Sequence, residues 1–377
     1  MSLVLFIVGF NVLILVHELG HYAVARLFGM NATRFSIGFG PALIRIRGRH
    51  TTFQFALIPF GGYVQIEGLT RDRSTPSKGF VRDSSTMAMH TFPPWQRGMV
   101  MLAGPLANFA LAIVTYSLLF GSSQAVTYDW RHEGTNVIRA VTGVAAAAGM
   151  KPYDAIESIN GRTVRTFAQM KRIVGETAGN TLRVTIRRSP DGSPPPMKRA
   201  VDEKTGLTIL YPDIPSHWPT HVLEMQAEKT PRGYVIGVSP DVMRFGSESW
   251  VGALKLGLVE TWAIVRGMVR IVGKWFEGTE PVQLASVVKM ADTGADTLKM
   301  GLEWFISFMA ILSINLGVIN LFPLPALDGG RLLFVIIEGV SRRAVPPRIE
   351  SIIHGVGMLF LMFLMVVIVV KEIIEKF

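Results

Sequence analysis

The sequence MSLVLFIVGFNVLILVHELGHYAVARLF, residues 1–28, decides how the rest of the chain is interpreted. Its first sixteen residues carry no charge, and its length suits a helix that crosses a bilayer, which needs roughly 20 apolar residues. It contains HELGH at 17–21, an HExxH pattern that places His17 and His21 on one helix face with Glu18 beside them. Such a face can bind zinc and hold a carboxylate that takes a proton from water. We therefore expect a metal site within a membrane helix.

The composition supports a membrane protein and limits the chemistry of any metal site. Of the 377 residues, 49% are hydrophobic, and they are concentrated in blocks along the chain. The net charge of +10 comes from basic residues between these blocks, so we expect a lipid bilayer and no nucleic acid as partner. There is no cysteine, so only His, Asp or Glu can bind a metal.

Four segments are long and apolar enough to span a bilayer: about 3–27, 99–120, 304–325 and 351–371. The first is expected to be a retained helix, because it has neither the basic start nor the small-residue cleavage site of a signal peptide. A further apolar segment, 248–276, carries charges at helical spacing. We therefore expect amphipathic helices at the membrane surface across 247–303.

The distribution of positive charge predicts the orientation in the membrane. The connections at 28–98 and after the third span are rich in arginine, and loops of this kind face the cytoplasm. Both termini and the region 121–303 are then expected on the outer side.

Two connecting regions show strand patterns. Apolar and polar residues alternate around glycines across about 35–68, which predicts short strands or hairpins. Across 137–188 the pattern predicts a strand, a small helix, a strand, a hairpin, a helix and a strand.

A catalytic zinc site usually has three protein ligands, so a third is needed. The best candidate is Asp328, in NLFPLPALDGG at 320–330. The two histidines lie about 22–28 Å along the first helix, at 1.5 Å per residue. Asp328 lies roughly 24 residues from the start of the third span, which runs in the same direction, so the two sites fall at similar depth. The prolines and glycines of this segment predict a break in the helix, and Asn320 within it could bind substrate backbone.

Simpler interpretations remain open for single residues. HExxH occurs by chance in unrelated helices, and Asp328 alone could be a turn residue. Asn108 in the second span is more typical of a kink or of packing than of a ligand. His354 is interpreted as structural, and Arg331 as a charge that binds lipid headgroups or sets topology.

Five motifs in order resemble the bacterial site-2 proteases, and among these the sigma-E-regulating type. They are HELGH at 17–21, GFGP at 38–41, IPFGGYV at 58–64, GPLANF at 104–109 and NLFPLPALDGG at 320–330. The resemblance covers essentially the whole chain. It implies a single Zn²⁺ bound by His17, His21 and Asp328, with Glu18 as general base and acid.

The same resemblance implies how substrate is bound. Strands at about 51–67 are similar to the family's membrane-associated β-hairpin, and the region about 137–240 is similar to a PDZ domain, which binds chain ends. The substrate-binding residues implied are Asn320, Pro323, Pro325, Gly61, Gly62 and Tyr63. The region 121–246 has room for one PDZ-like domain, whereas sigma-E-regulating members have two.

The expected fold is a polytopic α-helical membrane protein with four transmembrane helices, a membrane-associated β-hairpin and an extracytoplasmic PDZ-like α/β domain. Its expected domains are a membrane core at 1–120, the outer region at 121–246, interfacial helices at 247–303 and a second membrane core at 304–377.

The resemblance implies an intramembrane zinc endoprotease of the bacterial inner membrane. Its expected substrates are single-span membrane proteins already trimmed outside, either anti-sigma factors or signal-peptide remnants. Two alternatives stay open, a catalytically silent PDZ scaffold and a metal-ion transporter.

Overall fold

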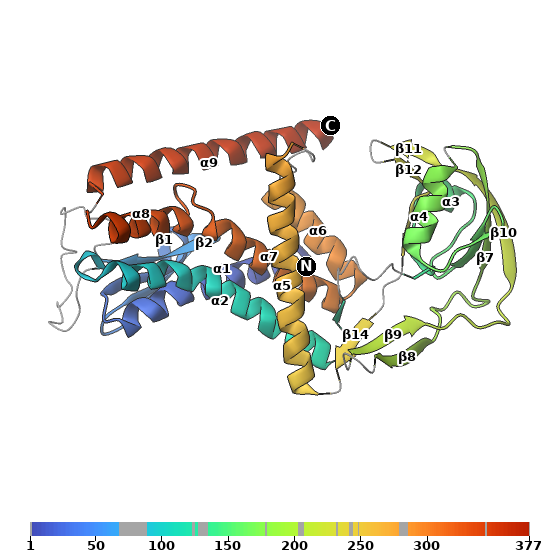
Figure 1. Ribbon diagram of the computed structural model, residues 1–377, viewed down its shortest axis with the longest axis horizontal. Coiled ribbons are helices and arrows are strands. Elements are labelled where there is room, and N and C mark those ends of the chain that lie inside the picture. Colours follow the sequence, from blue (N-terminus) through green and yellow to red (C-terminus); the bar gives the residue numbers. More distant parts are fainter. Residues whose placement is uncertain are drawn as a thin grey trace. The chain divides into compact units, whose positions relative to one another are not determined.

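The computed structural model describes most of the chain (Figure 1). The described residues are 2–67, 89–122, 125–126, 135–177, 179–202, 207–230, 233–240, 244–247, 249–278, 286–343 and 345–376. The chain divides into two compact units, one formed by Met1–Tyr116 with Gly257–Phe377 and the other by Ser117–Leu256. Each is described by itself.

The described residues include four helices that are long and apolar enough to cross a membrane. They are α1 (Ser2–Leu27), α2 (Pro94–Gly121), α7 (Leu302–Leu321) and α9 (Pro347–Lys376). The four predicted spans are therefore confirmed, and the chain is a polytopic helical membrane protein.

Two further helices fall where amphipathic helices were predicted. They are α5 (Trp250–Phe276) and α6 (Val287–Met300). Ser286 caps α6, since its hydroxyl accepts a hydrogen bond from the Lys289 N–H at 3.2 Å. The position of both helices at the membrane surface stays a prediction.

In the first unit, α1 packs against α6 and α7 through a cluster of large apolar side chains. The cluster contains Phe6, Leu13, Phe305, Met309 and Leu312. Lipid is as apolar as these side chains, so close packing and not water exclusion holds such helices together inside a bilayer. Phe6 and Leu13 lie on the same face of α1 as His17, three turns and one turn before it, so the cluster continues toward the histidines.

Between α1 and α2 the chain forms a sheet of two long antiparallel strands, β1 (Ala32–Arg47) and β2 (Thr52–Ile66), followed by a short 3₁₀ turn at Met89–Thr91. Both strands bend, so the first half of β1 pairs with the two halves of β2 at once: Phe35 lies opposite both Phe53 and Val64.

The hairpin predicted at about 51–67 is therefore wrong in its bounds. That stretch is a single bent strand, and its partner precedes it in the sequence. Glycines at 38, 40 and 61 have positive φ, from 84° to 108°, and bend the strands within the pairing. Glycines that the sequence suggests as turns between strands are thus bends inside them.

After α7 the helix stops, and a loop at 322–327 leads into α8 (Asp328–Ser341). Pro323 and Pro325 prevent a continuous helix, because proline cannot donate the backbone hydrogen bond. The sequence predicted only a short basic connection here, whereas the structure contains a helix of 14 residues.

An ion pair holds α8 against α2. Arg97 in the first turn of α2 donates to both carboxylate oxygens of Glu338, at 3.1 and 2.8 Å. Both side chains are largely buried, and a two-point arginine–carboxylate contact of this kind fixes orientation as well as distance.

The second unit confirms the order of elements predicted across 137–188. These are β4 (Ile138–Val141), α3 (Gly143–Ala147), β5 (Ala155–Ile159), β6 (Arg162–Thr163), α4 (Phe167–Glu176) and β7 (Thr181–Arg187). Strands β5, β6 and β7 form an antiparallel sheet with β10 (Thr220–Gln226), in the order β10-β7-β5-β6.

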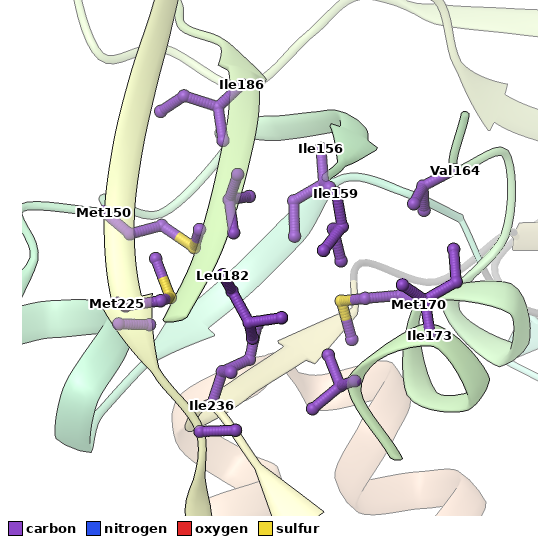
Figure 2. Close-up of a cluster of buried hydrophobic side chains, with 14 of the residues drawn as sticks. Met150, Ile156, Ile159, Val164, Met170, Ile173, Leu182, Ile186, Met225 and Ile236 are labelled. Carbon is purple, nitrogen blue, oxygen red and sulfur yellow. The ribbon is translucent and has the colours of Figure 1, made fainter. Parts of the chain in front are cut away.

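The core of this unit lies between the sheet and α4 (Figure 2). Leu182, Val184 and Ile186 alternate along β7 and are fully buried, while α4 contributes Met170 and Ile173. The period of two in the strand matches one buried face.

Shorter strands complete the second unit. They are β3 (Ala125–Val126), β8 (Met197–Asp202), β9 (Leu207–Pro212), β11 (Glu228–Thr230), β12 (Gly233–Val235), β13 (Val238–Pro240) and β14 (Arg244–Ser247). Strands β3, β14, β9 and β8 form a second sheet, and β13 pairs with β4.

Candidate metal centre

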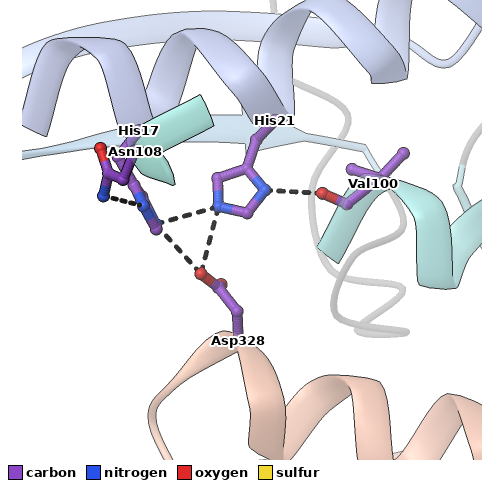
Figure 3. Close-up of polar contacts among 5 residues, drawn as sticks. All are labelled: His17, His21, Val100, Asn108 and Asp328. Carbon is purple, nitrogen blue, oxygen red and sulfur yellow. Dashed lines mark hydrogen bonds and ion pairs between the residues drawn. The ribbon is translucent and has the colours of Figure 1, made fainter. Parts of the chain in front are cut away.

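Three side chains from two distant segments meet in the first unit (Figure 3). His17 and His21 lie on successive turns of α1, and Asp328 is the first residue of α8. The Nε2 atoms of the histidines are 3.2 Å apart, and Oδ2 of Asp328 lies 3.1 Å from one and 3.2 Å from the other. The sequence predicted that these three residues lie at a similar depth, and in the structure their side chains are in contact.

The spacing of these three atoms fits a tetrahedral metal ion. Zinc binds imidazole nitrogen at about 2.0–2.1 Å and carboxylate oxygen at about 2.0–2.2 Å, so two ligands of a tetrahedral ion lie about 3.3–3.5 Å apart. The observed triangle, with edges of 3.1–3.2 Å, needs only a small expansion to hold one zinc ion and leave a fourth position open.

The second nitrogen of each imidazole is held by α2. Nδ1 of His21 lies 2.7 Å from the carbonyl oxygen of Val100, so it donates its proton there and Nε2 is left with a lone pair for metal. Nδ1 of His17 lies 3.1 Å from the side-chain amide of Asn108. Both imidazoles are buried.

Asn108 is fully buried, and its Oδ1 has no hydrogen-bond partner among the described residues. A half-turn of the amide exchanges its oxygen and nitrogen, so Oδ1 can accept the Nδ1 proton of His17. The interpretation of Asn108 as only a kink or packing residue is therefore incomplete. The signal in the sequence was an amide inside an apolar span, in the GPLANF motif.

Two glycines let the backbones of α1 and α2 approach closely enough for these contacts. A Cβ at Gly104 would lie 2.3 Å from Nε2 of His21 and 2.9 Å from Cε1 of His17. A Cβ at Gly20, inside the HELGH motif, would lie 2.3 Å from the Ala103 carbonyl oxygen. Neither position has room for a side chain.

The three residues open onto a cleft of about 280 Å³. Glu18 lines it, as do Gly61, Gly62, Tyr63 and Asn320 among the predicted substrate-binding residues. Pro323 and Pro325 do not line it; they shape the loop before Asp328. A Cβ at Gly62 would lie 3.5 Å from Cγ of Glu18, so the last part of β2 passes directly beside this carboxylate.

That part of β2 has a free edge. Residues 62–66 pair with the start of β1 on one side, and no strand pairs with their other side in the described parts of the chain. An unpaired strand edge offers N–H and C=O groups to another extended chain.

His354 holds the loop that precedes Asp328. Its Nδ1 accepts a hydrogen bond from the Ala326 N–H at 2.9 Å, and its ring lies edge-on to Phe334 of α8. Ala326 has a φ of 75°, which is unfavourable for a residue with a side chain, so an external contact is needed to hold it. The structural role of His354 is thus to hold the backbone at Ala326, in the loop before Asp328.

An HExxH pair on an apolar helix, with a carboxylate brought in from another part of the membrane bundle, defines a membrane-embedded metalloprotease site. Comparisons with known proteins agree. The model of peptidase family M50 matches residues 5–364, so the chain belongs to that family.

Curated relatives match along nearly their whole length. A candidate zinc metalloprotease of Mesorhizobium japonicum is 32% identical over 373 residues, which cover 97% of this chain and 96% of the relative. The zinc metalloprotease RasP of Geobacillus kaustophilus is 29% identical over 448 aligned positions, with 100% of this chain and 98% of the relative covered. The chain is thus a zinc metalloprotease, which favours an enzyme over the scaffold and the transporter.

Substitution of Gly104 tests the close approach of α2. We expect Gly104→Ala to lower zinc affinity at least about tenfold, because the new methyl group displaces the imidazole of His21. Gly98→Ala in the same helix is the matched control, since its nearest heavy atom would be a flexible leucine carbon at 3.4 Å. Zinc content of the purified proteins is the measurement, and normal zinc in Gly104→Ala would contradict the described spacing.

Substitution of Asn108 tests its contact with His17. We expect Asn108→Leu to weaken zinc binding about 10–100-fold, because Nδ1 of His17 loses its acceptor. Asn108→Asp keeps an acceptor and should bind zinc more tightly than the leucine variant. Competition with a chelator measures the affinities. Equal affinities for the leucine and aspartate variants would show that the amide does not orient the imidazole.

Proposed function

We propose that this protein is an intramembrane zinc endoprotease that cleaves single-span membrane proteins within their apolar segment. The observation that carries the proposal is the meeting of Glu18 and the three-residue metal site in one cleft, with Glu18 and both histidines on a helix apolar enough to cross a membrane. Ionisable groups inside a membrane bundle are costly and are a functional candidate by default.

In this proposal His17, His21 and Asp328 bind one zinc ion. Zinc bound there supplies a Lewis acid for the scissile carbonyl. The Val100 carbonyl and Asn108 keep both imidazoles in the tautomer that points Nε2 at the metal. Glu18 takes a proton from the attacking water and returns it to the leaving amine.

A membrane-spanning substrate must unwind before this chemistry can occur, because its carbonyls are otherwise hydrogen-bonded within the helix. The free edge of β2 at 62–66 supports a way to stabilise the unwound segment, as an added strand. Gly61, Gly62 and Tyr63 belong to this edge region, and the amide of Asn320 on α7 would bind the segment further along the cleft. Pro323 and Pro325 would hold the loop beside it open.

The second unit is proposed to be a PDZ-like domain at about 137–240 that binds substrate chain ends. Its order of strands and helices and its exposed sheet support this. The proposed domain scheme keeps membrane cores at 1–120 and 304–377, the outer region at 121–246 and interfacial helices at 247–303.

The proposed setting is the bacterial inner membrane, with both termini and the outer region extracytoplasmic. The proposed substrates are anti-sigma factors or signal-peptide remnants that another protease has first trimmed outside, as in regulated intramembrane proteolysis. The motif order, which resembles sigma-E-regulating site-2 proteases, supports this choice.

Removal of the proposed base tests the chemistry. We expect Glu18→Gln to lower the cleavage of a single-span model substrate in proteoliposomes by at least about 100-fold, the usual contribution of general acid–base catalysis. Zinc content should be unchanged, since Glu18 is not one of the three clustered ligands. Glu277→Gln, at an exposed site after α5, is the matched control. Unchanged cleavage by Glu18→Gln would disprove the mechanism.

The absence of native cysteine makes the orientation directly testable. Ser193 in the outer region and Ser341 at the end of α8 are both exposed. In intact cells, we expect an impermeant thiol reagent to label Ser193→Cys from outside and Ser341→Cys only after the membrane is opened. The reverse pattern would overturn the proposed orientation.

A further inference from the structure

The cleft contains a charged side chain that the proposed chemistry does not use. Arg331 lies in the first turn of α8, one turn after Asp328, and it lines the cleft with Glu18 and Asn320. It is the only arginine or lysine among the described residues that line this cleft. Its sequence position had suggested a charge at the membrane surface.

Helix geometry gives a second reason for this placement. Arg331 and Glu338 are seven residues apart, so they lie on nearly the same face of α8. Glu338 is bound by Arg97 of α2, and Val335 on the same face lies near Gly98 of α2. The face that bears Arg331 is therefore turned toward α2, which also holds the two imidazoles.

The guanidinium of Arg331 has no carboxylate or other acceptor among the described residues, although the side chain is half-buried. A guanidinium has five N–H donors and no acceptor, and a partly desolvated one is costly unless an acceptor meets it. Glu338, on the same face, is already held by two bonds from Arg97. The acceptor must then come from outside the described protein.

An unwound substrate supplies such an acceptor. A membrane-spanning segment is apolar in its side chains, so its exposed acceptors are the backbone carbonyls that lost their helical partners. The donors that the cleft offers them include the β2 edge, the hydroxyl of Tyr63, the amide of Asn320 and the guanidinium of Arg331. An acidic substrate side chain fits less well, because Glu18 and Asp328 already place two carboxylates there.

We propose that Arg331 binds a backbone carbonyl of the unwound substrate and so positions the extended segment in the cleft. This inference rests on the proposed function. It makes Arg331 a substrate-binding residue that acts before bond cleavage. Arg331 donates hydrogen bonds to the substrate, whereas the Val100 carbonyl and Asn108 accept hydrogen bonds from the imidazoles.

Binding is measured with the full chain in the Glu18→Gln background, in detergent micelles. The probe is a synthetic single-span peptide with an alanine–leucine core and one central Asn-Gly pair. A second probe replaces one amide at this pair by an ester, whose carbonyl is a weaker acceptor, and a third adds one glutamate there. Fluorescence anisotropy gives the dissociation constants, and zinc content is measured for every variant.

We expect Arg331→Gln to weaken binding of the amide probe about tenfold, as for loss of one hydrogen bond to a charged donor. The ester probe should bind more weakly than the amide probe to the protein that keeps Arg331. The Arg331→Gln variant should bind the ester and amide probes with nearly equal dissociation constants. The affinity of Arg331→Lys for the amide probe should lie between those of the protein with Arg331 and of Arg331→Gln. Arg343→Gln, an exposed arginine after α8, is the matched control and should bind normally.

Three results would overturn the inference. Additive effects of ester and Arg331→Gln would show that the guanidinium does not meet that carbonyl. An effect confined to the glutamate probe would identify an acidic side chain as the partner. Loss of zinc from both Arg331→Gln and Arg331→Lys would make Arg331 a support of the metal site.

The binding assay needs no cleavage, so it separates this inference from the proposed function. If the binding effects are non-additive but the wild-type protein does not cleave substrate, only the proteolysis proposal is disproved. If the wild-type protein cleaves substrate but Arg331→Gln does not change binding, only the inference about Arg331 is disproved.

Discussion

The close contact between α1 and α2 is the constraint on which the metal site depends. Two imidazoles in an apolar helix need a partner for each ring nitrogen, and the hydrocarbon of a bilayer offers none. Helix α2 provides both partners, the Val100 carbonyl and the Asn108 amide. Gly20 and Gly104 are necessary for this, because any side chain there would separate the helices or enter the imidazole rings.

Asp328 is held close to the histidines by contacts of the segments before and after it. Asp328 begins α8, and the loop before it contains a residue with unfavourable φ. Two contacts hold this segment: His354 of α9 binds the Ala326 N–H, and Glu338 at the far end of α8 is fixed by Arg97 of α2. The carboxylate is therefore placed by contacts on both sides of it, and α2 takes part in positioning all three clustered residues.

Much of the fold could be predicted from local pattern. The four spans follow from long apolar runs, and the order of elements in the second unit follows from periodicity and turn residues. The bent sheet could not be predicted, because glycine signals both a turn between strands and a bend within one, and only pairing distinguishes them. Helix α8 was missed since its short apolar stretch, with Arg331 inside it and Arg342 and Arg343 directly after it, matches a membrane-flanking loop.

The sequence by itself determined the chemistry: an HExxH pair that follows sixteen uncharged residues, and an aspartate at a matching depth 307 residues after His21. Spacing along a helix and depth in a membrane are both one-dimensional quantities, so counting residues is sufficient for them. Only the tertiary structure decided which groups orient the imidazoles, which strand edge borders Glu18 and where Arg331 points. These depend on which faces of separate helices meet, and that is set by packing between segments far apart in the chain.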